Sequence, residues 1–183
     1  MKEWIGYYEN ILTNELSENI ALNSKSWKQS TYSSHKGENP IEKSLQRVVM
    51  NESYITENMT YYVDLLNASK NVIELYLKKH RYMKYFAPNK CTHFRVNKYE
   101  EGGFMSEHAD NIHHSHHQQY GYPLASLLFF LNDGYEGGEL IISDITYKPK
   151  KNSAIIFPSN FLFPHSVNKI IKGTRYSIIT WLM

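Results

Sequence analysis

The sequence of 183 residues contains a single cysteine, Cys91, and this scarcity excludes an internal disulfide framework. It has no run of the ~18 apolar residues that a membrane-spanning helix needs, and no apolar segment of signal-peptide length near its start. The formal net charge is only +2, with acidic and basic residues interspersed, so neither a nucleic acid nor a membrane is indicated as a partner. We therefore expect a soluble, cytoplasmic protein from a reducing compartment.

The length of the chain, residues 1–183, is that of one domain with its own hydrophobic core. Residues 1–90 are expected to form a mainly helical, supporting part. Helices are predicted at 13–24, which begins with capping residues, and at 56–81, where apolar residues recur at three- and four-residue intervals without glycine or proline. Residues 91–183 have a different character and are expected to form the β-rich core.

The β-rich part consists of short alternating or apolar segments that are separated by turn residues. Strands are predicted at 91–99, 124–132, 137–143, 152–158, 164–170 and 174–182, with weaker candidates at 26–32 and 44–50 and a loop at 33–40. Such a series fits an antiparallel sandwich or barrel with helices packed outside it.

The stretch YEEGGFMSEHAD ends in His108 and Asp110, which are separated by one residue. In an extended strand, residues i and i+2 point to the same face, so an imidazole and a carboxylate would project together. His165 is the best candidate for a third metal ligand. Two histidines and one carboxylate leave coordination positions open, as in non-haem Fe(II) oxygenases, but the same set can hold zinc in hydrolases. The ligand set alone therefore leaves the reaction open.

Arg175 lies ten residues after His165, beyond a Lys172-Gly173 turn, on a strand expected to return antiparallel to the strand of His165. A buried guanidinium needs an anionic partner, and its forked geometry matches a carboxylate. Ser177 would face the same side and could donate to the same carboxylate. A carboxylate receptor near a metal site suggests a dicarboxylate cosubstrate.

Two ordered strings of residues carry a family resemblance. The string Y-x-x-G-x-x-x-x-x-H-x-D begins at Tyr99 and ends at Asp110, and the string P-H-x-V-x-x-I-x-x-G-x-R-Y-S spans residues 164–177. Together they resemble the 2-oxoglutarate/Fe(II)-dependent dioxygenases, specifically the prolyl 4-hydroxylase-like group. The GGEL turn at 137–140 is also similar to the family's mid-barrel turn, and the resemblance covers roughly residues 90–183.

The resemblance implies a mainly β fold, a double-stranded β-helix or jelly roll with helices packed outside. His108, Asp110 and His165 would bind Fe(II), and Arg175 would hold the 5-carboxylate of 2-oxoglutarate with help from Ser177. Dioxygen would be the second cosubstrate, and ascorbate is a candidate reductant.

Three further positions follow from the same comparison with the family. Tyr99 stands where the family often places a tyrosine that lines the cosubstrate pocket, with core packing as the alternative. Phe129 or Phe130 stands where some relatives have a carboxylate-binding tyrosine, and collagen-type enzymes have lysine in place of Arg175. Trp181 is expected in the core, with a position lining the pocket as the alternative.

The resemblance implies hydroxylation of a proline in a peptide or protein, with conversion of 2-oxoglutarate and O2 to succinate and CO2. The same chemistry on a free amino acid, another side chain or a small molecule stays open, as does a non-catalytic jelly-roll module that binds a metal or ligand. A polar loop is expected directly after the metal ligands, and it could contact the substrate or act as a lid. It contains His113, His114, His116 and His117, for which a second metal site is the alternative.

Overall fold

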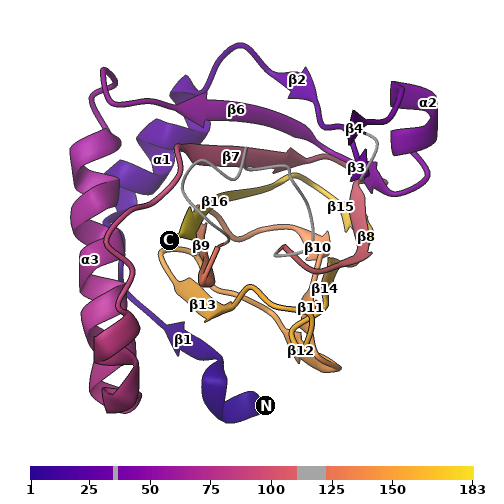
Figure 1. The fold of residues 1–183 in the computed structure, drawn as a ribbon. Helices are drawn as coiled ribbons and strands as arrows, with labels where there is room; N and C mark the ends of the chain where they lie inside the picture. The colour runs from indigo at the N-terminus through magenta and orange to yellow at the C-terminus, as the bar shows by residue number, and fades with distance from the viewer. Residues whose placement is uncertain (35–36, 111–122) are drawn as a thin grey trace.

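The computed structural model describes residues 1–34, 37–110 and 123–183, and its fold is shown in Figure 1. The helical elements, in chain order, are η1 (Lys2–Trp4), α1 (Asn14–Asn23), α2 (Ile41–Ser44), α3 (Tyr62–Lys79) and η2 (Arg81–Phe86). The strands are β1 (Gly6–Tyr8), β2 (Lys28–Gln29), β3 (Ser33–Ser34), β4 (Gly37–Glu38), β5 (Val48–Val49), β6 (Asn51–Ile55), β7 (Phe94–Tyr99), β8 (Phe104–His108), β9 (Ala125–Phe130), β10 (Glu136–Gly137), β11 (Leu140–Ile142), β12 (Ile145–Tyr147), β13 (Ala154–Pro158), β14 (His165–Val167), β15 (Ile170–Lys172) and β16 (Arg175–Leu182).

The strands form two main antiparallel sheets that face each other across a common interior (Figure 1). The larger sheet has the order β1-β13-β9-β16-β7-β6-β2, and the smaller has the order β12-β11-β14-β8-β5. Short pairs β10-β15 and β3-β4 complete the described ladders. The prediction of a mainly β jelly roll with helices outside is confirmed.

The larger sheet separates two hydrophobic clusters because successive side chains of a strand point to opposite faces. Residues such as Phe129 and Ile178 point outward toward the helices, whereas Phe130 and Ile179 point into the barrel. Every residue of β9 is buried, since both faces of this strand are covered. The interior face is where the larger sheet can present side chains to a ligand.

Helices α1 and α3 cover the outer face of the larger sheet (Figure 1). The predicted first helix is confirmed, and the Thr13 hydroxyl caps it by accepting a hydrogen bond from the backbone N–H of Leu16 at 3.1 Å. The second helix begins at Tyr62 rather than at residue 56, because residues 57–61 form turns instead. Within the described ranges, no helix is both long and apolar enough to cross a bilayer.

The N-terminal half contributes more strands than its sequence predicts. β1 pairs with β13 and β6 pairs with β7, so both extend the larger sheet. The weak candidates at 26–32 and 44–50 shrink to the two-residue strands β2 and β5, and the predicted loop at 33–40 contains β3 and β4. Pairing with strands distant in the sequence stabilises these short strands, and the local sequence pattern does not predict such pairing.

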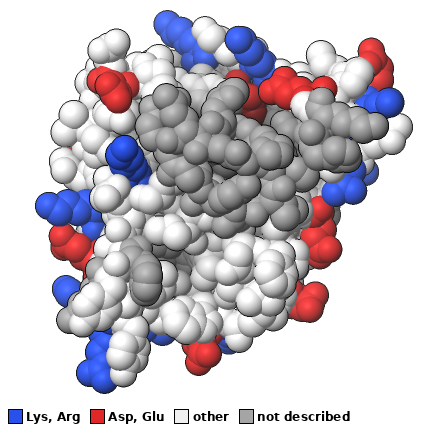
Figure 2. All heavy atoms as spheres, viewed as in Figure 1, with Lys and Arg blue, Asp and Glu red and all other residues white. Residues whose placement is uncertain are grey.

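Charged side chains of both signs are interspersed on the described part of the face in Figure 2. Ion pairs at the surface include Lys150 with Glu9 and Lys151 with Glu18. The charged side chains that could bind a ligand lie inside the barrel.

Candidate active site

Three possible metal ligands meet inside the jelly roll. His108 ends β8 and His165 begins β14, and the two residues are paired across this antiparallel ladder. Asp110 follows shortly after β8, and its carboxylate oxygens lie 3.6 Å from Nε2 of His108 and 3.5 Å from Nε2 of His165. One ligand atom from each residue lies within 4.8 Å of the other two. All three side chains can therefore reach a single ion.

Backbone carbonyl groups fix the orientation of both imidazoles. Nδ1 of His108 donates to the carbonyl oxygen of Ser106 at 2.9 Å, and Nδ1 of His165 donates to that of Phe163 at 3.2 Å. A carbonyl oxygen can only accept, so each Nδ1 carries a proton and each Nε2 is the ring nitrogen that faces Asp110. Such fixed tautomers are typical of metal-binding histidines.

The protonation states of Asp110 and His165 also suit metal binding. Burial opposes ionisation of Asp110, but the neighbouring histidines and a hydrogen bond from Ser126 hold the pKa of its carboxyl well below the usual range. Ser126 Oγ donates to Asp110 Oδ2 at 2.5 Å. Burial lowers the pKa of His165 to about 4, so its imidazole is neutral at pH 7. A carboxylate and neutral imidazoles are the forms that bind a metal, and two nitrogens with one oxygen fit Fe(II).

Arg175 is fully buried, with 0% of its surface exposed. Within the described ranges, none of its three guanidinium nitrogens makes a hydrogen bond of good geometry and no carboxylate pairs with it. The Tyr99 and Tyr135 hydroxyls interact with the guanidinium electrostatically, but neither supplies a negative charge. Its neighbours are aromatic, since the guanidinium carbon lies 5.1 Å from the ring centroid of Tyr99 and 5.3 Å from that of Phe130. A buried cation without a counter-ion is costly, so this position fits an anionic ligand.

Ser177 lies two residues after Arg175 on the same face of β16, as predicted. Its buried hydroxyl also lacks a hydrogen-bond partner in the described part of the chain. Tyr99 is 2% exposed and is paired with Arg175 across β7 and β16. Burial raises the pKa of Tyr99, and the charge of Arg175 opposes this shift without overcoming it. Tyr99 therefore borders the same buried cation as a neutral phenol.

One spatial expectation was wrong. The strand of Arg175 does not run beside the strand of His165, because β16 pairs with β7 and β9 in the larger sheet whereas β14 pairs with β11 and β8 in the smaller one. Strand β15 intervenes in the chain between them. The cation and the metal ligands thus come from opposite walls of the barrel.

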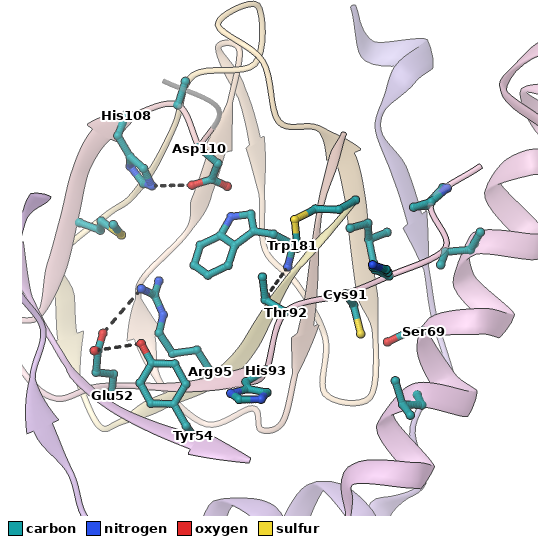
Figure 3. A pocket seen from close by; sticks show the side chains of 18 of the residues that line it. Glu52, Tyr54, Ser69, Cys91, Thr92, His93, Arg95, His108, Asp110 and Trp181 are labelled. Carbon is teal, nitrogen blue, oxygen red and sulfur yellow. Dashed lines mark hydrogen bonds and ion pairs between the residues drawn. The ribbon is translucent and has the colours of Figure 1, made fainter. Parts of the chain in front are cut away.

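A pocket of about 1310 Å³ opens beside the metal ligands and is lined by His108 and Asp110 (Figure 3). Trp181 lines it as well and also packs against the interior hydrophobic cluster, so the expected core position and the alternative pocket position both describe it. The prediction of a loop at 113–117 lies outside the described residues. The pocket extends from the metal ligands toward α3, where Ser69 and Ile73 contribute to its wall.

Two polar residues of this region escaped the sequence reasoning. Ser126 is a lone hydroxyl in an otherwise apolar buried strand, and that isolation was the signal that could have marked it. Arg95 alternates with buried apolar residues of β7 and therefore had to face the interior. Neither belongs to the motifs that carried the resemblance.

Residues 94–183 match the family model of the 2OG-Fe(II) oxygenase superfamily. Through these residues, the chain belongs to that superfamily. The match covers both strings of residues named above and includes all three potential ligands together with Arg175. The resemblance inferred from the sequence is thereby confirmed.

Individual relatives of this chain are PKHD-type hydroxylases of bacteria. It is 34% identical over 122 residues to a PKHD-type hydroxylase of Pseudomonas putida (strain W619), which covers 60% of this chain and 51% of the relative. It is 32% identical over 100 residues to a PKHD-type hydroxylase of Crocosphaera subtropica, covering 52% and 44% of the two chains. The chain spans about half the length of the curated relatives it matches.

Solved structures share the fold of this superfamily member over nearly its whole length. A Pseudomonas putida prolyl-4-hydroxylase has a TM-score of 0.70 at 14% identity, covering 98% of this chain and 91% of its own. A Trichoplax adhaerens prolyl hydroxylase, solved with a hypoxia inducible factor peptide fragment, has a TM-score of 0.72 at 14% identity, covering 99% and 84%. At such identities the likeness establishes the jelly-roll fold.

Proposed function

We propose that this chain is an Fe(II)- and 2-oxoglutarate-dependent dioxygenase that hydroxylates a proline residue within a peptide or protein. The observation that carries the proposal is the buried, unpartnered guanidinium of Arg175 inside the barrel that also holds His108, Asp110 and His165. A metal site alone would also suit a hydrolase. A metal site together with a buried receptor for an anion suits a dicarboxylate cosubstrate.

The ligands have defined roles in this proposal. His108 and His165 would hold Fe(II) through Nε2, and Asp110 would hold it through a carboxylate oxygen. When bound, Fe(II) supplies the redox chemistry that couples oxidation of 2-oxoglutarate by O2, giving succinate and CO2, to hydroxylation of the substrate. Ser126 keeps the Asp110 carboxylate in one orientation through its 2.5 Å hydrogen bond.

Arg175 would bind the 5-carboxylate of 2-oxoglutarate through two parallel N–H···O bonds, and the Ser177 hydroxyl would donate a third. These contacts would satisfy the polar atoms that have no partner in the described part of the barrel. Tyr99 and Phe130 flank the guanidinium and exclude water from it. This dry setting strengthens the charge-assisted bonds that orient the cosubstrate.

The proline substrate is supported by the relatives rather than by the metal site. Three similar solved proteins are prolyl hydroxylases, and one of them is a viral collagen prolyl hydroxylase of Paramecium bursaria Chlorella virus-1. The pocket of about 1310 Å³ has room for a segment of polypeptide beside the metal ligands.

The test is aerobic incubation with Fe(II), 2-oxoglutarate and ascorbate, in which succinate and O2 consumption are measured together. Proline-containing peptides should raise both rates and gain 16 Da, with the added oxygen localised to proline by fragmentation. Omission of ascorbate should reduce the number of turnovers if it serves as the reductant. The Asp110→Ala variant should form no succinate, because it lacks one of three ligands.

Three other outcomes would refute parts of the proposal. Hydroxylation of free proline or of another side chain, with peptidyl proline untouched, would replace the substrate and keep the reaction. Hydrolysis without O2 consumption would point to a zinc enzyme. Tight binding of 2-oxoglutarate without succinate from any peptide would make the chain a binding module.

A further inference from the structure

Arg95 is a second guanidinium inside the barrel, and the proposed reaction leaves it without a role. It comes from β7, four residues before Tyr99 on the same face of the strand. Its side chain is 14% exposed and lines the pocket that His108 and Asp110 also line (Figure 3). A largely buried arginine is usually paired within the protein, so the donors that remain after its protein contacts decide what it can bind.

Three neighbours hold the Arg95 guanidinium in place. Nη1 lies 3.6 Å from a carboxylate oxygen of Glu52, and Nε donates to the side-chain oxygen of Asn97 at 3.0 Å. The guanidinium carbon lies 5.0 Å from the ring centroid of Trp181. The Tyr54 hydroxyl donates to the other oxygen of Glu52 at 3.2 Å, which fixes that carboxylate in turn. The Tyr54 hydroxyl also interacts with the Arg95 guanidinium itself. Among the described residues, the geometric hydrogen bonds and ion pairs engage Nε and Nη1 and leave Nη2 for a ligand.

The two interior arginines therefore differ in charge balance. Arg175 has no carboxylate beside it among the described residues, so an anion is its natural ligand. Arg95 already has the carboxylate of Glu52, and a second anion at Nη2 would meet the repulsion of the first. A neutral acceptor would gain the hydrogen bond from Nη2 without that repulsion. Among neutral acceptors in biological substrates, the amide carbonyl oxygen is the strongest in common use.

We propose that Arg95 positions the substrate by donating a hydrogen bond from its guanidinium to a neutral peptide carbonyl next to the hydroxylated residue, and that Glu52 sets this preference. The inference rests on the proposed function and narrows its substrate class. The substrate presents amide groups rather than a free carboxylate, so it is a residue within a chain and not a free amino acid. Trp181 supports the same position by packing against the guanidinium.

The test compares two probes that differ only in the C-terminal group, N-acetyl-L-proline N′-methylamide with a neutral amide and N-acetyl-L-proline with a carboxylate. Their Kd values are measured by calorimetry on the protein with Fe(II) and 2-oxoglutarate under anaerobic conditions, so that no turnover intervenes. The wild type should bind the amide more tightly than the acid. Arg95→Met should weaken amide binding about tenfold or more, as expected for the loss of a hydrogen bond from a charged donor.

Arg81→Met is the matched control. Arg81 also stacks over an aromatic ring, with its guanidinium carbon 5.2 Å from the Tyr82 centroid, but it is exposed and does not line the pocket. This variant should bind both probes as the wild type does. A general effect of replacing arginine with methionine would appear in both variants.

Glu52→Gln tests the role of the counter-ion. It removes one negative charge beside Arg95 and leaves a side chain of the same size, so the preference should move toward the acid by about tenfold. If Arg95→Met fails to fold because Glu52 is left unpaired, the double variant Glu52→Gln/Arg95→Met removes both charges and should lose discrimination between the probes.

Three results would overturn the inference: wild-type binding of the acid as tight as that of the amide, wild-type binding of neither probe, or unchanged amide binding in Arg95→Met. A separate aerobic assay of succinate formation reports on the proposed function. Arg95-dependent amide binding without any succinate would refute the oxygenase and support the role of Arg95. Succinate formation together with amide binding that does not depend on Arg95 would support the oxygenase and refute the role of Arg95.

Discussion

Replacement of Arg175 by methionine should make the protein more stable without ligand and less able to bind 2-oxoglutarate. The guanidinium is 0% exposed and none of its nitrogens has a hydrogen-bond partner in the described ranges. Each unsatisfied buried polar group costs about 1–3 kcal/mol, and a buried charge costs more. Attraction to the rings of Tyr99 and Phe130 returns on the order of 0.5–2 kcal/mol for each ring.

In the absence of ligand, the free energy of unfolding of Arg175→Met should therefore exceed that of the wild type by about 1–3 kcal/mol, because methionine fills a similar volume without a charge. For a chain of this length, that gain corresponds to a rise in Tm of roughly 2–4 °C per kcal/mol. Addition of 2-oxoglutarate at about 100 times its Kd should raise the free energy of unfolding of the wild type by about 2.7 kcal/mol. The variant should show little of this effect, since loss of a charge-assisted anchor worth about 2–3 kcal/mol weakens binding roughly 30- to 150-fold.

Thermal unfolding with and without 2-oxoglutarate, together with calorimetric Kd values, would measure both effects. Arg175→Lys is the matched variant, because it keeps the charge and loses the forked geometry. It should retain the cost of the buried charge and part of the affinity. A variant Arg175→Met that is less stable than the wild type without ligand, and binds 2-oxoglutarate equally well, would refute the assignment of Arg175 as an unpartnered anion receptor.

Further outcomes follow from other residues. Ser126→Ala should weaken binding of Fe(II) or Mn(II) about 10- to 100-fold, as measured by metal titration, because Asp110 loses its orienting hydrogen bond. The pKa of His165 is lowered by burial from 6.5 to about 4, so the unfolded chain binds the extra proton in this window and stability falls with falling pH. Urea unfolding of the metal-free protein should show a loss of about 2 kcal/mol between pH 7 and pH 5, and His165→Gln should flatten that slope. Gly138→Ala should cost over about 1 kcal/mol more than Gly134→Ala in the same assay: both residues have positive φ, but only at Gly138 would a Cβ lie 2.3 Å from a neighbouring side chain.

The ligand pair and the C-terminal string could be predicted because they are local in sequence. His108 and Asp110 lie two residues apart, and Ser177 lies two residues after Arg175, so strand periodicity alone placed each pair on one face. The assumption that both residues lie in one strand was incomplete for His108 and Asp110, because β8 ends at His108 and Asp110 lies just beyond it. The side chains meet nevertheless through the carboxylate, which Ser126 holds in place.

The position of each strand in the fold was harder to predict because it depends on pairing between distant segments. The sequence gives no signal that β14 and β16 belong to different sheets, so Arg175 was expected beside the strand of His165. The predictions of short strands such as β2 and β5 were weak or had shifted bounds for the same reason, because cross-strand partners stabilise these strands. Helix α3 was predicted well apart from its first turn, because its apolar periodicity is local.

The difference between the two interior arginines is the clearest case of information that only the fold contains. In the sequence, both arginines stand among alternating strand residues. The pairing of β6 with β7 sets Glu52 opposite Asn97 and diagonal to Arg95, and a slip of one residue would turn Glu52 to the outer face. The residue paired with Arg175 is instead Tyr99, which offers a ring and no charge. The register of two strand pairs thus decides which guanidinium has a counter-ion and which needs an anion from outside the chain.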